Sequence, residues 1–311
     1  MENQTFVTEF ILSGFCTGPK VQLFLFGVVF VIYVASLTGN ALVFVLVCLD
    51  PQLYTPMYFF LCHLSILDLC YASSNVPHVL GSLLLQRKTI SFAACGTQIY
   101  LYLALALTEC LLLTVMSYDR YVAICHPLRY SLIVNWRVCL TLMACSWVCG
   151  FLFGALQTGL ALRLPFCGPR QVDHFFCEIL AVFKLACADT TINKIMIFAV
   201  CVFFLLCPFC LILISYLHIL AAILSIHSAE GQRKTFSTCS SHLLTVGLFY
   251  GTAIFMCMGS GTSSQHRQKI LSLFYSFINP MLNPLIYSLR NKQVKGALVK
   301  VLRMEKFYHS T

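Results

Sequence analysis

Seven long stretches with few or no charged side chains constrain this chain more than any other feature of its sequence. Five contain no Asp, Glu, Lys or Arg: residues 21–49, 138–162, 195–229, 235–266 and 270–289. Two more contain one carboxylate each, Asp68 in residues 51–86 and Glu109 in residues 89–118. A helix needs roughly 20 mostly apolar residues to cross the hydrocarbon of a bilayer. Each stretch is therefore long enough to cross once.

The composition agrees with a membrane protein. Of 311 residues, 59% are hydrophobic and 10% are charged, against about 25% charged in soluble domains. This excludes a soluble enzyme, a basic nucleic-acid binder and a disordered chain. The strands of membrane barrels are about ten residues long and alternate in polarity, whereas these stretches are apolar all round, as buried or lipid-facing helices are.

We therefore predict an all-α membrane protein with one seven-helix bundle spanning residues 1–311. The longest segment between spans, residues 163–194, is too short for a soluble domain, which usually starts near 50 residues. The predicted tails are residues 1–20, outside the cell, and 290–311, in the cytosol. The spans are expected at approximately 22–47, 58–80, 97–118, 140–160, 196–220, 238–259 and 270–289.

The orientation of the bundle cannot be decided from its basic residues. With the amino terminus outside, 11 Lys and Arg lie on the inner side and nine on the outer side, a small excess for the positive-inside rule. Asn3-Gln4-Thr5 matches the acceptor pattern for glycosylation, which occurs on the lumenal side. This sequon favours an extracellular amino terminus.

Cysteine placement favours the same orientation. Most of the 18 cysteines lie inside the predicted spans, where a free thiol behaves as a small apolar group. Four lie instead on one side of the membrane, at the start of the third span and in the loop after the fourth: Cys95, Cys167, Cys177 and Cys187. Four cysteines allow three pairings, and each pairing requires the oxidising side.

The third span carries a stripe that links three depths of the membrane. At helical spacing, Tyr102, Glu109 and Arg120 fall on one face, together with Ala106, Leu113 and Met116. From Tyr102 to Arg120 the helix rises about 27 Å. A buried carboxylate is costly in a bilayer, so a protonated, hydrogen-bonded Glu109 is the simplest structural interpretation. The stripe has the geometry of a signal relay.

The seventh span and the segment after it carry two further features. Asn279-Pro280 and Asn283-Pro284 lie within the span, and each proline frees a carbonyl and bends a helix. The bend could act as a hinge, or Asn283 could simply satisfy the freed group. After Arg290, apolar and basic residues alternate at helical spacing, which predicts a short amphipathic helix on the anionic inner leaflet.

Six motifs follow one another at the span boundaries. They are Gly39-Asn40, LYTPMYFF (53–60), LSILD (64–68), MSYDRYVAICHPLRY (116–130), KTFSTCSSH (234–242) and PMLNPLIYSLRN (280–291). Together they cover almost the whole chain, which resembles a rhodopsin-like G protein-coupled receptor, and specifically a vertebrate olfactory receptor. The sixth span lacks the Cys-Trp-x-Pro sequence of other rhodopsin-like receptors and has Phe249-Tyr250-Gly251, as olfactory receptors do. Tyr54 and Thr235 depart from the residues that olfactory receptors often carry there.

The resemblance implies roles for individual residues. Asp119 holds Arg120 at rest, and Tyr216 and Tyr287 meet Arg120 in the active state. The full set expected to couple to the G protein is Asp119, Arg120, Tyr121, Tyr216, Asn283, Pro284 and Tyr287. The implied disulfides are Cys95–Cys177 and Cys167–Cys187.

A buried polar site is implied by Asn40, Asp68 and Glu109. Two carboxyl groups so close would share a proton or a Na⁺ ion, and no other cofactor is expected. A metal site at His174–Glu178 is disfavoured, because the resemblance places Cys177 in a disulfide and metals bind the free thiolate.

The resemblance also implies a ligand pocket between the third, fifth, sixth and seventh spans. Tyr250 would act as the toggle. The expected lining is mostly apolar: Tyr102, Leu103, Ala106, Leu107, Val200, Cys201, Phe204, Tyr250, Ala253, Cys257 and Ser276. Such a pocket suits a small, neutral, volatile organic ligand of micromolar affinity. Helix packing is the alternative role of each of these residues.

The expected function is that of an odorant receptor, and not of an enzyme. It would activate a stimulatory heterotrimeric G protein of olfactory type, raise cyclic AMP and lie in the plasma membrane of olfactory cilia. The alternative is a membrane transporter or channel, which would show repeated halves or rings of charge along a pore. The sequence shows neither feature.

Overall fold

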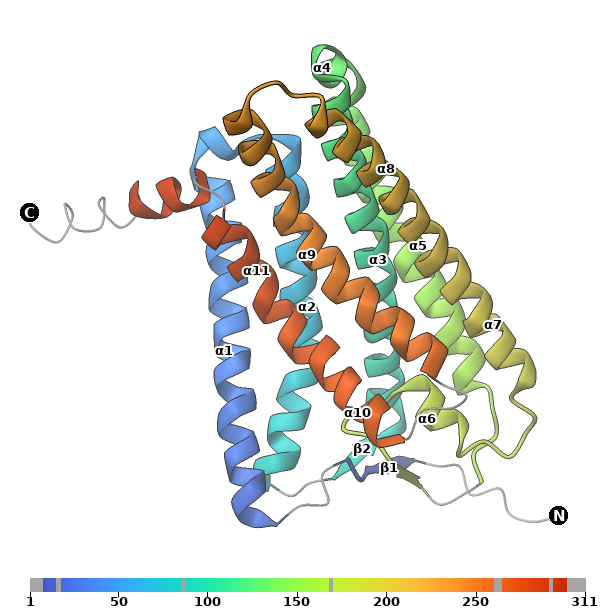
Figure 1. Ribbon diagram of the computed structural model, residues 1–311. Helices are drawn as coiled ribbons and strands as arrows, with labels where there is room; N and C mark the ends of the chain where they lie inside the picture. The colour runs from blue at the N-terminus through green and yellow to red at the C-terminus, as the bar shows by residue number, and fades with distance from the viewer. Residues whose placement is uncertain are drawn as a thin grey trace, which may run out of the picture.

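The computed structural model describes residues 8–14, 18–85, 88–167, 170–259, 265–290 and 293–300. Within these ranges seven helical rods are long and apolar enough to cross a membrane, and they stand side by side as a bundle (Figure 1). Five rods are single helices: α1 (Pro19–Leu49), α2 (Pro56–Leu85), α3 (Phe92–Cys125), α5 (Trp136–Leu162) and α9 (Ala229–Gly259). Two are composite: α7 (Thr191–Cys201) with α8 (Cys207–Leu224), and α10 (Gln265–Leu273) with α11 (Asn279–Arg290). The chain is thus a helical bundle of the predicted class.

The two composite rods each contain a π-helical segment. Val202–Leu206 joins α7 to α8, and Phe274–Ile278 joins α10 to α11. A π segment widens one turn and loosens the regular hydrogen-bond ladder. The second segment ends directly before Asn279-Pro280, where the sequence predicts a bend.

The helices extend beyond the spans predicted from the sequence. The third rod was expected at 97–118 but runs over 34 residues, Phe92–Cys125, or about 50 Å at 1.5 Å per residue. Ser91 caps its first turn by accepting a hydrogen bond from the Ala94 amide at 3.2 Å. The helix needs only part of its length to cross about 30 Å of hydrocarbon, so both ends reach the polar regions outside it.

Small residues bring α3 and α5 into direct contact. A Cβ on Gly150 would lie 2.1 Å from Thr108 Oγ1 and 2.8 Å from the Ala104 carbonyl oxygen, and one on Gly154 would lie 2.9 Å from Ala104 Cα. Membrane helices associate through such close backbone approaches, since lipid supplies no hydrophobic drive between helices. The two glycines therefore set the position of α5 on α3.

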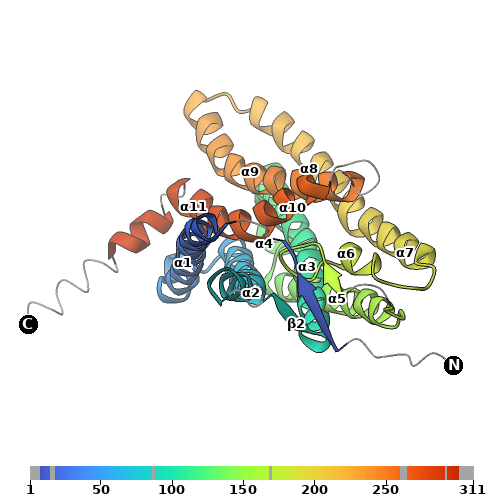
Figure 2. The ribbon, with the colours of Figure 1, turned by 90° about the horizontal axis from the view of Figure 1, so that it is seen from below.

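One end of the bundle is covered by a small sheet and two disulfides, and we call it the disulfide end. Strand β1 (Glu9–Leu12) lies between β2 (Thr89–Ser91), to which it is antiparallel, and β3 (Gln171–Val172), to which it is parallel. Figures 1 and 2 show β1 crossing this end next to the short helix α6 (Ile179–Phe183). The sheet joins the amino-terminal segment to the loops before α3 and after α5.

The opposite end carries the short helix α4 (Tyr130–Ile133) and the carboxy-terminal segment (Figure 1). Residues 293–300 are helical, as the amphipathic pattern predicts. Lys300 Nζ lies 3.2 Å from Asp50 Oδ2, and the Tyr58 hydroxyl donates to Gln293 Oε1 at 2.6 Å. These contacts hold the segment against the turn between α1 and α2. Residues 301–311 of the predicted cytosolic tail lie outside the described residues.

Candidate ligand and signalling site

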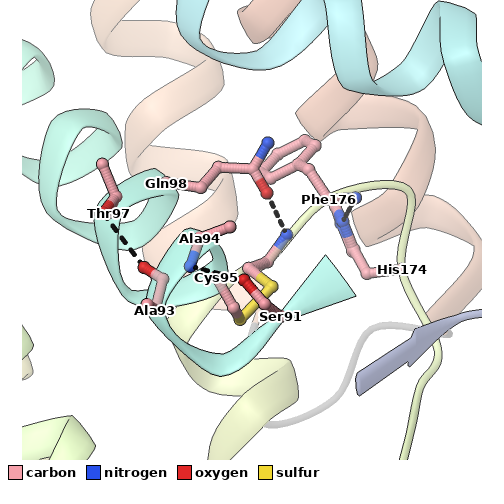
Figure 3. The surroundings of a disulfide bond; sticks show 9 residues. Ser91, Ala93, Ala94, Cys95, Thr97, Gln98, His174 and Phe176 are labelled. Carbon is pink, nitrogen blue, oxygen red and sulfur yellow. Dashed lines mark hydrogen bonds between the residues drawn. A yellow bond between two sulfur atoms is a disulfide. The ribbon is translucent and has the colours of Figure 1, made fainter. Parts of the chain in front are cut away.

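Two disulfides position the loop between α5 and α7 over the disulfide end. Cys95 at the start of α3 is bonded to Cys177, and Cys167 to Cys187 within the loop. Figure 3 shows the first bond, beside which the Gln98 side chain accepts a hydrogen bond from the Cys177 amide at 2.9 Å. Phe176 is therefore held against α3.

An aromatic cluster lies beneath this loop. The ring centroid of Tyr102 lies 5.4 Å from those of Tyr71 and Phe176 and 6.1 Å from that of Tyr275. These rings come from α3, α2, the loop and the seventh rod. Of the four, only Tyr102 was predicted from the sequence. Tyr71 was predictable from its place one turn after Asp68. The approach of Phe176 and Tyr275 to Tyr102 depends on the fold.

The expected ligand residues differ in their exposure. Tyr102, Leu103 and Ala106 are half-buried, as are Val200, Cys201, Phe204 and Ala253. Leu107, Tyr250 and Ser276 are buried. The Phe204 ring lies 4.7 Å from that of Phe153 on α5, a contact between rods. The Cys257 side chain lies outside the described residues.

The same loop is joined to the start of the seventh rod by polar contacts. His174 Nε2 lies 3.0 Å from Ser272 Oγ, and Lys269 forms an ion pair with Asp173. Burial and the nearby charge of Lys269 lower the pKa of His174 to about 4. The imidazole is therefore neutral at pH 7, and its Nε2–H can donate to Ser272 because Nδ1 faces the Phe176 amide.

Deeper in the bundle, α1 satisfies a carbonyl that a proline leaves free. Pro284 has no N–H to donate to the carbonyl of Pro280 four residues earlier. The Asn40 side chain donates to that oxygen instead, at 2.8 Å. Gly39 permits the approach, because a Cβ there would lie 2.9 Å from Pro284 Cγ. Asn40 thus satisfies the freed carbonyl, a role that the sequence suggested for Asn283.

Asn283 instead contacts a carboxylate. Its Nδ2 lies 3.2 and 3.0 Å from the two carboxylate oxygens of Asp68, and the Glu109 carboxyl lies within electrostatic range of Asp68. Within the described residues, Glu109 Oε1 and both side-chain polar atoms of Asn279 are buried without a hydrogen-bond partner. Carboxylate oxygens accept a hard cation, and a Na⁺ ion or a shared proton at Asp68 and Glu109 stays a prediction.

At the end opposite the disulfides, Arg120 is 6% exposed. The Tyr130 hydroxyl donates to Asp119 Oδ1 at 2.7 Å, a contact the sequence analysis did not predict. The charge of Arg120 acts on a ring of neighbours: Asp119, Tyr216, Cys239, His242 and Tyr287. Arg120 thus lies among groups from α3, α8, α9 and α11.

His242 connects three of these helices. Its Nε2 lies 3.2 Å from the Leu113 carbonyl oxygen, and its Nδ1 lies 2.7 Å from the Tyr216 hydroxyl. Since a carbonyl only accepts, Nε2 carries the proton, and Tyr216 donates to Nδ1. His242 lies within the motif KTFSTCSSH, from which no role for it was predicted.

We expect His242→Phe to raise signalling in the absence of ligand. The substitution removes two bonds that link α8 and α9 to α3, and a buried hydrogen bond of about 1 kcal/mol corresponds to a roughly fivefold shift in a two-state equilibrium. Basal cyclic AMP at matched surface expression measures the effect. Tyr216→Phe is the control. It removes one of the same two bonds, and it also removes a hydroxyl that is expected to meet Arg120 in the active state. Unchanged basal signal in His242→Phe would contradict the prediction.

Two other expected residues have defined contacts. The Tyr250 hydroxyl donates to the Cys110 carbonyl oxygen at 2.9 Å and is fully buried, so it ties α9 to α3 at mid-membrane. The Tyr121 hydroxyl lies 3.3 Å from His126 Nε2. The Tyr287 hydroxyl is buried without a hydrogen-bond partner among the described residues.

These features define a seven-helix membrane receptor, and comparison with known proteins identifies its family. Residues 29–306 match the family described as olfactory receptor. Human olfactory receptor 2A12 is 59% identical over 301 residues, covering 96% of this chain and 97% of the relative. Human olfactory receptor 2A1/2A42 is 58% identical over 98% of both chains, and mouse olfactory receptor 2A7 is 56% identical over 98% of both. The chain belongs to the olfactory receptor family, whose members are multi-pass membrane receptors coupled to G proteins and are not enzymes.

Proposed function

We propose that this chain is an odorant receptor that binds a small, neutral, volatile organic molecule near its disulfide end. Binding activates a stimulatory G protein of olfactory type and raises cyclic AMP. The observation that carries the proposal is the α3 rod, which joins the aromatic cluster around Tyr102 to Arg120, about 27 Å away along one helix.

The aromatic cluster supports a neutral and mainly apolar ligand. Three of the four rings carry hydroxyls, and the Ser276 hydroxyl is buried without a partner among the described residues. These groups can orient an alcohol, ketone or ester, while the rings bury its carbon atoms. Ligand efficiency limits so small a molecule to micromolar affinity. The eleven lining residues expected from the sequence remain part of this proposal.

The proposed orientation puts the disulfide end outside the cell. The two disulfides support it, because such bonds persist on the oxidising side of a membrane. Asn3, the proposed glycosylation site, belongs to the same tail as β1 but lies outside the described residues. The proposed location is the plasma membrane of olfactory cilia.

A screen of neutral volatiles tests the proposal. Cells carrying the receptor and a cyclic AMP reporter should respond to some neutral volatiles and to no charged or peptide ligand. Tyr102→Ala should then shift the half-maximal concentration upward about fivefold or more, since aromatic contacts contribute about 1 kcal/mol beyond burial.

The matched control is Tyr100→Ala. The Tyr100 ring packs against Phe151 on α5, with centroids 5.9 Å apart, so its loss should leave the response unchanged. Equal shifts in both variants would remove the case for the aromatic cluster as the ligand site. Ion flux through purified receptor in vesicles would favour the channel alternative instead.

A further inference from the structure

A groove between α8 and α9 lies at the end of the bundle opposite the disulfides. It has a volume of about 360 Å³, within the range of about 300–1,000 Å³ that is usual for ligand sites. Its walls include Leu220, Ile223 and Leu224 from the last turns of α8, and Ala229, Arg233 and Phe236 from the first turns of α9. None of them belongs to the ligand or signalling residues described above.

The walls of the groove are apolar and open. Leu220, Leu224 and Phe236 are 46%, 69% and 55% exposed, while Ile223 forms a floor that is 5% exposed. Both helices belong to rods that are apolar enough to cross the membrane. Exposed apolar patches of this kind mark contacts with a partner or a membrane, and the acyl chain of a lipid can supply such a contact. The groove is therefore shaped for a hydrocarbon chain.

One charged side chain lines this apolar groove. Arg233 is exposed on the second turn of α9, and no carboxylate in the described part of the chain forms an ion pair with it. A guanidinium binds phosphate through two parallel hydrogen bonds. The groove thus combines an apolar wall with a group suited to a phosphate.

The turn between the two helices fixes the groove before any occupant arrives. The Gln232 side chain donates to the Ile226 carbonyl oxygen at 2.9 Å, and the Gly231 amide donates to Ser228 Oγ at 3.2 Å. A Cβ at Gly231 would lie 2.6 Å from Ser228 Oγ, so the turn is tight. A preformed site loses little affinity to ordering.

We propose that this groove binds one anionic phospholipid, with an acyl chain against Leu220, Leu224 and Phe236 and the phosphate on Arg233. In the orientation given under Proposed function, this end faces the cytosolic leaflet, which is rich in anionic lipids. An anionic lipid fits better than a zwitterionic one, whose own ammonium group offsets the charge of its phosphate.

Photocrosslinking of the purified full-length receptor tests the site. Photoreactive phosphatidic acid and phosphatidylcholine with identical acyl chains are compared, and the labelled peptides are identified by mass. Phosphatidic acid should label the α8 and α9 peptides about fivefold more, since a basic residue near anionic lipid contributes about 1 kcal/mol. Arg233→Gln should reduce its labelling to the phosphatidylcholine level. Arg137→Gln, which changes an exposed arginine at the same end, should leave the labelling unchanged.

One further variant and one competitor distinguish a lipid site from a simple phosphate site. Ala229→Trp fills the groove but keeps the charge, so it should lower labelling by both lipids. Glycerol phosphate, which has no acyl chain, should not compete, and competition by it would instead indicate a simple phosphate site. Equal labelling by both lipids, unaffected by Arg233→Gln, would overturn the proposal. No odorant or G protein is present, so the result does not depend on whether the proposed function is correct.

Discussion

Replacing Gly150 with valine is expected to remove the receptor from the cell surface. The new Cβ would lie 2.1 Å from Thr108 Oγ1 and 2.8 Å from the Ala104 carbonyl oxygen. Backbone atoms of α3 cannot yield to it, so α5 must move away. The Thr108 hydroxyl already donates to the Ala104 carbonyl at 2.8 Å, and that bond would be displaced too. Overpacking of this kind costs about 1–3 kcal/mol or more, a large part of the stability of a typical fold.

Flow cytometry of an amino-terminal tag on intact cells measures this effect, with total protein quantified after permeabilisation. We expect surface signal to fall to background while synthesis continues. Gly159→Val on the same helix is the matched control, because a Cβ at Gly159 meets nothing within 4 Å and the residue is exposed. Similar losses in both variants would show that valine in α5 is harmful for a reason other than helix packing.

Arg120→Ala is expected to abolish odorant-evoked cyclic AMP without removing the receptor from the surface. Arg120 is buried at the end of α3, and its charge acts on groups from α8, α9 and α11. Alanine removes that charge and its hydrogen bonds. The proposed relay then has no group that connects α3 to the other rods at the end opposite the disulfides. Buried networks of this kind fail as units, and we expect a loss beyond tenfold.

The response is measured with an agonist from the screen, at matched surface expression. Arg163→Ala is the control, since it removes an exposed arginine at the disulfide end of α5, far from the network. An agonist response that survives Arg120→Ala would rule out the proposed relay along α3. A response lost equally in Arg163→Ala would point to impaired folding.

The bundle was predictable because a membrane imposes a length on every span. Charge-free stretches of about 20 residues can hardly fold otherwise in lipid, where each backbone group must be paired internally. The ends of the rods were less predictable. The third runs well past residues 97–118 because Ser91 caps its start and its ends lie outside the hydrocarbon.

The candidate site was predictable only in part, since hydrogen-bond partners depend on tertiary packing. The seventh-span prolines indicated a freed carbonyl, but nothing local showed that Asn40 lies 2.8 Å from it and that Asn283 lies by Asp68 instead. The Tyr130 contact with Asp119 and the His242 bridge likewise join residues from different helices. The ligand residues from the resemblance remain predictions.

The hydrogen bond from Asn40 to the Pro280 carbonyl makes α1 a participant in any bending of the seventh rod. If that rod straightens or twists, the carbonyl turns and the amide must follow or leave a buried acceptor unsatisfied. The first helix lines no part of the proposed odorant site, yet it sets how freely the seventh can flex. Natural variation in α1 could therefore alter the sensitivity of a receptor while leaving its choice of odorant unchanged.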